Sequence, residues 1–128
     1  MKKIYSFLIL LFLTSSLYSK NTQAYLSYAT FYSPADGPYI ETYLSVVGKS
    51  VEFVKNANGK FQATVQISMV FRQNDIIKDF KKIDLFSPEV EDTGKIDFAF
   101  IDQQRFLLPN GDYNVEIQIL DKNKISGY

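Results

Sequence analysis

The sequence predicts an all-β protein, an antiparallel β-sandwich of about seven strands. Between Phe61 and Phe71, apolar side chains stand at every second position and mostly polar ones lie between them. The same period of two returns from Tyr113 to Ile119, and it is typical of a strand with one buried face. Turn signals separate several such runs, and no segment after the first 24 residues has a helical period.

Turn residues divide the chain into short strands. Two prolines and a glycine within residues 33–38 indicate a loop, and Asn58-Gly59 favours a tight hairpin. Lysines within 76–85 are typical of an edge strand, where they discourage pairing with foreign strands. We interpret the polar residues 102–105 as an interruption between strands. The expected strands are 25–32, 39–47, 51–54, 60–72, 76–85, 95–101 and 113–121.

The segment from Leu108 to Tyr113 forms the most specific motif of the chain. Pro109 fixes its own φ and Gly111 tolerates a positive φ, so the chain reverses here. A tyrosine two residues after a turn glycine, opening an alternating strand, resembles the tyrosine corner of immunoglobulin-like sandwiches. In that corner the tyrosine hydroxyl bonds to main chain a few residues upstream. We therefore expect Leu108, Gly111 and Tyr113 to form a structural corner in an immunoglobulin-like fold.

The first 24 residues have the pattern of a secretory signal peptide. Met1-Lys2-Lys3 precedes an almost wholly apolar run over residues 4–13, which is shorter than the roughly 20 residues of a membrane-spanning helix. We expect a signal-peptide helix here, with cleavage after Ser19 or Ala24. Residues 25–128 would then form a single β-sandwich domain, exported to the periplasm or the cell exterior, with no membrane span.

Composition excludes several classes of function. The chain has 14 basic and 14 acidic residues; the first 24 residues carry three lysines and no acid, so 11 basic residues remain against 14 acidic ones. This mildly acidic remainder, without a basic run, is unsuited to binding nucleic acid. The chain has no His and no Cys, which excludes Ser-His-Asp and Cys-His catalysis and metal sites built on imidazole or thiolate. We expect no cofactor, no metal and no catalytic activity.

Two groups of oxygen-bearing side chains are candidates for a catalytic or calcium site. Glu89, Glu91 and Asp92 cluster in one polar connection and offer paired carboxylates or calcium ligands. Asp121 with Asn123 offers a second set of calcium ligands. For both groups we favour the alternative interpretation that these are solvated loop residues.

The end of the chain suggests an incomplete sandwich. In an immunoglobulin-like sheet, the strand after the tyrosine corner pairs with one more strand. Residues 121–124 have the composition of a turn into that strand, and only four residues follow them. We expect the sequence to be a fragment whose final strand is missing. The alternative is that a partner supplies this strand by strand addition.

Three segments carry a resemblance to a known family. They are Phe31-Tyr32 before a Pro/Gly loop and residues 39–44, the Asn58-Gly59 hairpin into residues 61–65, and residues 108–113 leading to a strand that ends at Asp121. Over about residues 25–124 the chain resembles the amino-terminal region of secreted Bacteroidota proteins with a GWxTD domain. The Gly-Trp-x-Thr-Asp signature, which lies farther downstream in that family, is absent because the chain has no Trp. The resemblance implies an exported, envelope-associated protein and supplies no catalytic residues.

The function favoured by these observations is that of a non-catalytic exported module. It would serve protein–protein interaction or act as a spacer for a downstream domain of the same chain. The alternative is a carbohydrate-binding module. Tyr28, Tyr39 and Tyr43 would form its stacking platform if they share an exposed sheet face. The competing interpretation of these tyrosines is that they fill the core or cover a sheet edge.

Overall fold

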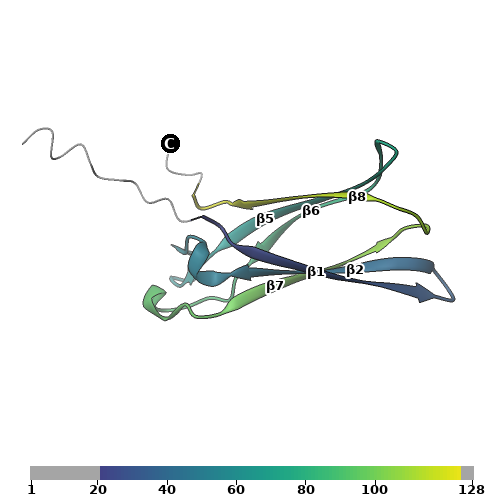
Figure 1. Ribbon diagram of the computed structural model, residues 1–128. Coiled ribbons are helices and arrows are strands. Elements are labelled where there is room, and N and C mark those ends of the chain that lie inside the picture. The colour runs from purple at the N-terminus through teal and green to yellow at the C-terminus, as the bar shows by residue number, and fades with distance from the viewer. Residues whose placement is uncertain (1–20, 125–128) are drawn as a thin grey trace, which may run out of the picture.

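The structure, a computed structural model, describes residues 21–124 and is all-β (Figure 1). The expected signal-peptide helix lies outside the described residues. The elements in chain order are β1 (Ala24–Ser33), β2 (Gly37–Val47), the 3₁₀ turn η2 (Gly48–Ser50), β3 (Val54–Lys55), β4 (Phe61–Gln62), β5 (Thr64–Gln73), β6 (Ile76–Phe86), the 3₁₀ turn η3 (Thr93–Lys95), β7 (Ala99–Leu107) and β8 (Asn114–Asp121).

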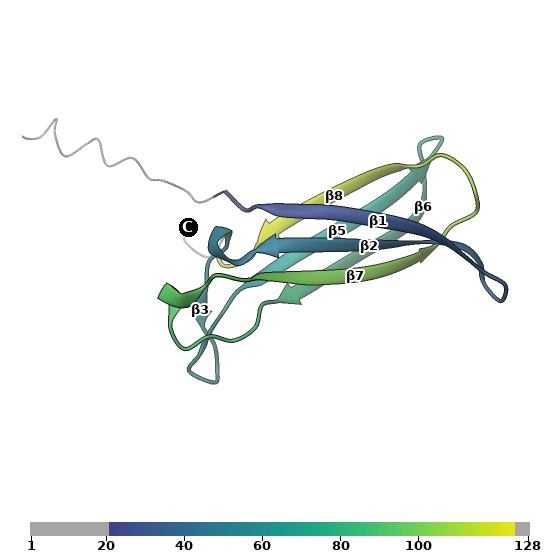
Figure 2. The ribbon, with the colours of Figure 1, turned by 60° about the horizontal axis from the view of Figure 1, so that its bottom comes forward.

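Two three-stranded antiparallel sheets form the layers of a β-sandwich. One sheet has the order β1-β2-β7 and the other the order β6-β5-β8, while β3 and β4 make a separate small hairpin. Figure 2 shows β1, β2 and β7 in front of the second layer. The predicted antiparallel β-sandwich is confirmed.

The core lies between the inner faces of β5 and β2. Val65, Ile67, Met69 and Phe71 alternate along β5 and are all almost completely buried, as the period-two pattern predicted. Thr42 of β2 joins the two layers, because its hydroxyl donates a hydrogen bond to the Met69 sulfur at 3.6 Å. Apolar burial of this kind is the dominant favourable term in folding.

The expected strands at 51–54 and 60–72 are partly wrong. Residues 48–50 form η2, and only Val54–Lys55 pairs, as β3, with β4. The long strand is interrupted at Ala63, whose N–H donates to the Ser87 hydroxyl at 2.9 Å and whose carbonyl accepts from the Ser87 N–H at 3.0 Å. Ser87 therefore takes the place of a strand partner where the chain passes from the small hairpin into the main sheet.

The expected strand at 95–101 and the interruption at 102–105 are also wrong. The strand is β7, which runs through the polar residues without a break and pairs with β2 from Ala99 to Leu107. Several of its polar side chains find partners within the sheet: the Gln104 amide donates to Asp102 Oδ1 at 2.9 Å, and Arg105 pairs with Glu41 of β2 at 2.7 Å. The other carboxylate oxygen of Asp102 is buried without a hydrogen bond among the described residues. Side-chain pairing across strands is invisible to a hydrophobicity pattern, which explains the error.

Replacing Ile67 with Ala tests the core. Ile67 is fully buried in the central strand, and removing its side chain leaves a cavity between the sheets, so we expect a loss of about 2–5 kcal/mol in unfolding free energy. Chemical denaturation measures the change. As the control, Ile101→Ala removes the same side chain from the exposed face of β7 and should cost less than about 0.5 kcal/mol. Equal losses in the two variants would contradict this assignment of the core.

Candidate functional site

One side of the sandwich is open, along strands β1 and β8. β1 pairs only with β2 and β8 pairs only with β5, so each strand has one free edge. Both strands run along the same side of the molecule (Figures 1 and 2). Within residues 21–124 no further strand pairs with either edge.

The inner faces of these two strands are apolar and partly exposed. Leu26 and Tyr28 of β1 stand opposite buried residues of β2 in the register, so they belong to the face that looks into the sandwich. They are nevertheless 42% and 67% exposed. On β8, Val115 stands opposite the buried Phe71 and is 42% exposed. The apolar interior therefore reaches solvent on this side.

A groove with a volume of about 700 Å³ lies between strands β1 and β2 and the segment 108–113, at the start of β8. Its lining comes from β1, β2 and the segment 108–113, with Phe71 and Val115 from the other sheet. Asp112 is the one charged side chain among the lining residues. A groove of this size, with an apolar lining and few polar groups, is typical of a binding site.

The opposite side of the sandwich is closed by Lys81 of β6. Its ammonium group donates to the main-chain oxygen of Arg105 at 2.7 Å and to the Gln104 side chain at 3.3 Å. It also lies 4.6 Å from the centre of the Phe106 ring. These contacts tie β6 to β7 across the two layers, whereas the structure describes no hydrogen bond between β1 (24–33) and β8 (114–121). One side of the sandwich is therefore closed by contacts between β6 and β7, and the side with β1 and β8 is open.

A tyrosine corner holds one end of the groove. The Tyr113 hydroxyl donates a hydrogen bond to the Pro109 carbonyl oxygen at 2.6 Å, and Leu108 is buried in the core. Gly111 has φ +153°, and a Cβ there would lie only 2.5 Å from Nε2 of the Gln73 side chain. The corner fixes the point at which the chain enters β8.

Asp121 fixes the other end of β8. This nearly buried carboxylate accepts hydrogen bonds from the main-chain N–H groups of Glu52 at 2.8 Å and Asn123 at 3.1 Å. The Asn123 amide donates to the Glu52 carbonyl oxygen at 2.8 Å. Asp121 and Asn123, the two candidate calcium ligands, thus both form hydrogen bonds that close the turn after β8. Residues 21–124 contain no cluster of three or more side chains suited to a metal ion.

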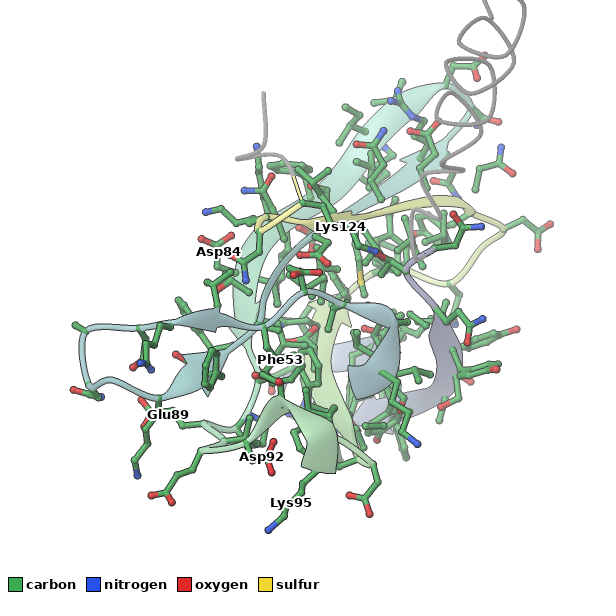
Figure 3. The ribbon with its side chains drawn as sticks, turned by 90° about the vertical axis from the view of Figure 1, so that its left-hand side faces the viewer. Phe53, Asp84, Glu89, Asp92, Lys95 and Lys124 are labelled. Carbon is green, nitrogen blue, oxygen red and sulfur yellow. The ribbon has the colours of Figure 1, made fainter. Side chains whose placement is uncertain are left out.

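The acids of the polar connection also have structural partners. The Glu89 carboxylate accepts from the side-chain amides of Asn56 at 2.8 Å and Asn58 at 2.9 Å, and the Asp92 side chain accepts from Gly94 N–H at 2.8 Å. Figure 3 shows Glu89 beside the β3–β4 hairpin and Asp92 beside η3. Glu91 is exposed. The described contacts bring no pair of these carboxylates together.

The outer face of the β1-β2-β7 sheet carries a polar and aromatic cluster. Glu41 accepts hydrogen bonds from the Tyr43 hydroxyl and from Arg105, whose guanidinium lies 4.4 Å from the centre of the Tyr39 ring. Phe31 stacks on Tyr39 with ring centroids 5.3 Å apart. The hydrogen bond from Tyr43, followed by those from Arg105, lowers the pKa of Glu41. The same Tyr43–Glu41 hydrogen bond, followed by burial, raises the pKa of Tyr43. The cluster favours a charged carboxylate.

The three tyrosines of the expected sugar platform do not share one face. Tyr39 and Tyr43 stand on the outer face of β2, in register with Phe31 and Ser27 of β1. Tyr28 stands on the inner face of β1. Both Tyr28 and Tyr39 are among the residues that line the groove. Strand parity separates Tyr28 from Tyr43, because successive side chains of a strand point to opposite faces.

The groove itself was not predicted from the sequence. Two signals were available. The ten residues of β1 include no charged side chain, which is unusual for a free edge, and the sequence already predicted that the strand after the tyrosine corner lacks a neighbour. The partnership of Glu41 with Arg105 had no signal, because the two residues are 64 positions apart and meet only through the β2–β7 register.

Comparisons of the chain with protein-family models, with curated proteins and with solved structures gave no match. Among residues 21–124, no helix has the length and apolar character needed to cross a membrane.

Replacing Tyr113 with Phe tests the corner. The variant keeps the ring and removes the hydroxyl that donates to Pro109, so we expect a loss of about 1 kcal/mol in unfolding free energy. Denaturant titration gives the value. Tyr25→Phe, at an exposed tyrosine of β1, is the matched control and should change stability by less than about 0.5 kcal/mol. A Tyr113→Phe variant as stable as this control would show that the hydrogen bond contributes nothing.

The Glu41 cluster predicts a specific acid sensitivity. Because the folded-state pKa of Glu41 lies below its ordinary value of 4.5, the cluster's contribution is complete above that value and is lost as the pH falls through the lowered pKa. Glu41→Gln removes the titrating group. Thermal unfolding from neutral pH into acid should show a steeper loss of stability for the natural protein than for the variant. Parallel curves would contradict the assignment.

Proposed function

We propose that this protein is a non-catalytic exported β-sandwich module that binds another protein through its open side. The observation that carries the proposal is the uncharged, partly exposed inner face of β1 above the groove. Contiguous exposed apolar surface of this kind generally marks an interaction site. Export is proposed from the basic and apolar pattern of residues 1–13.

The distribution of charge among the edge strands supports this proposal. β6 carries Lys78, Lys81 and Lys82, and charged edge strands are a common protection against foreign pairing. β1 is almost as long and has no charged residue. The contrast between the charged edge of β6 and the uncharged edge of β1 therefore favours a binding role for the side on which β1 lies.

A spacer for a downstream domain is the second form of the same proposal. The resemblance to the amino-terminal region of GWxTD proteins supports it, since that family places its signature segment farther along the chain. In this form the groove would contact the following domain.

Carbohydrate binding is the other candidate, and the outer face of the sheet favours it. Tyr39, Tyr43 and Arg105 lie together there, and aromatic rings beside hydrogen-bonding groups suit a sugar ring. The half-buried Tyr39 is already covered by Phe31 and Arg105, so this candidate ranks second.

Photo-crosslinking tests the first proposal. A benzoylphenylalanine at position 28, in the groove, should form a discrete protein adduct in the cells that produce the chain. The same group at position 101, on the exposed outer face of β7, is the control and should form none. Adducts of equal yield at the two positions would overturn the proposal.

A glycan array tests the second candidate. Binding by a sugar-recognition face should fall by at least about tenfold in Tyr39→Ala and Tyr43→Ala, while Tyr28→Ala should leave it unchanged. Glycan binding that survives both outer-face substitutions would exclude this candidate.

A further inference from the structure

We propose that the groove receives an extended strand of a partner polypeptide, which pairs antiparallel with the free edge of β8. This inference rests on the proposed protein-binding function and names the chemistry of the partner. The strand would carry apolar side chains at alternate positions facing the groove.

The main-chain groups of β8 supply the first argument. Lys122 N–H donates to the Thr64 carbonyl oxygen at 3.0 Å, in continuation of the β5–β8 register. Because hydrogen-bonding direction alternates along an antiparallel strand, the N–H and C=O groups of Val115, Ile117 and Ile119 point away from β5. They form a row of donors and acceptors along the free edge of β8, and Val115, the first of the three residues, lines the groove. An extended strand satisfies such a row, and a helix does not.

The exposure of side chains shows where the partner strand would lie. On the inner face of β1, Leu26, Tyr28 and Tyr32 are all exposed, whereas on β8 Ile117 and Ile119 are partly buried and Asp121 is buried. Beyond Val115, β8 is therefore covered by the opposite sheet, whereas no strand within residues 21–124 covers the inner face of β1 at Leu26 and Tyr28. The uncovered space lies beside β8, where a fourth strand of the β6-β5-β8 sheet would run. Its side chains would cover Leu26 and Tyr28.

Charge defines the chemistry of the incoming strand. Side chains that face the groove would meet a lining whose one charged residue is Asp112, at the tyrosine-corner end, so they should be apolar. Side chains on the other face would lie near Glu116, which is exposed on the outer face of β8 and makes only a 3.5 Å ion pair with Arg72. A lysine on that face complements Glu116. The partner segment is thus an alternation of β-branched apolar residues with polar and basic ones.

A defined peptide probes this proposal with the full chain. The probe has about nine residues, a length that matches β8, with valine at alternate positions and threonine or lysine between them; a scrambled peptide of the same composition is its control. We expect saturable binding by fluorescence anisotropy for the alternating peptide, at least about tenfold tighter than for the scrambled one.

Val115→Pro distinguishes strand pairing from simple apolar contact. Proline removes the N–H that points to the free edge and leaves the β5–β8 hydrogen bonds in place, so peptide binding should fall by at least about tenfold. Val115→Thr keeps that N–H and a similar shape, and it should change binding by less than about threefold. Circular dichroism and thermal unfolding establish that both variants are folded.

Each result bears on the proposal. Binding lost only in Val115→Pro supports strand addition. No preference for the alternating peptide, or equal binding by both variants, overturns it. If position 28 still crosslinks to a protein in cells while Val115→Pro has no effect, the interaction function stands and the strand mode falls. A dimer of this chain that Val115→Pro dissociates in sedimentation experiments would replace the partner with a second copy and also overturns the proposal.

Discussion

The burial of the inner face of β5 against β2 and β7 is the constraint on which the fold depends. The chain has no Cys, so no disulfide can hold the two sheets together. Phe71 packs on Phe106 with ring centroids 4.5 Å apart, and the Thr42 hydroxyl reaches the Met69 sulfur at 3.6 Å. Since β6 and β8 are joined to their sheet by pairing with β5, this contact between layers sets the position of the whole β6-β5-β8 sheet.

The two sides of the sandwich solve the problem of unpaired strand edges differently. On one side Lys81 covers Phe106 and bonds to β7, so a charged side chain both seals the core and repels a foreign strand. On the other side, β1 and β8 leave apolar inner faces partly open. An apolar free edge is an aggregation hazard. The opposite side of this molecule is protected from such pairing, and this contrast is the reason for proposing a binding role for the open side.

Much of the fold could be predicted from the sequence because strand periodicity is local. The alternation in β5 and β8 and the turn at Gly111 each depend on a few neighbouring residues. The wrong strand at 95–101 came from the same rule, because Asp102 and Arg105 are polar yet held within the sheet by Gln104 and Glu41. The missing neighbour of β8 was expected from the tyrosine corner, but the groove was not, since its lining also depends on how β1 and β2 lie over the segment 108–113. The sequence likewise did not show that Tyr28 and Tyr43 lie on opposite faces of the sheet, because this depends on the register between β1 and β2.

Strand β8, at whose start the groove lies, is held at both ends by hydrogen bonds. β8 is anchored at its start by the hydrogen bond from Tyr113 to Pro109 and at its end by the carboxylate of Asp121, which accepts from Glu52. Between these anchors the strand is paired with β5 throughout, so its free edge is already extended. Preorganisation of this kind lowers the ordering cost of binding on the side of the receptor. In the proposed strand addition the cost would then fall on the incoming segment, which favours a partner that is already extended.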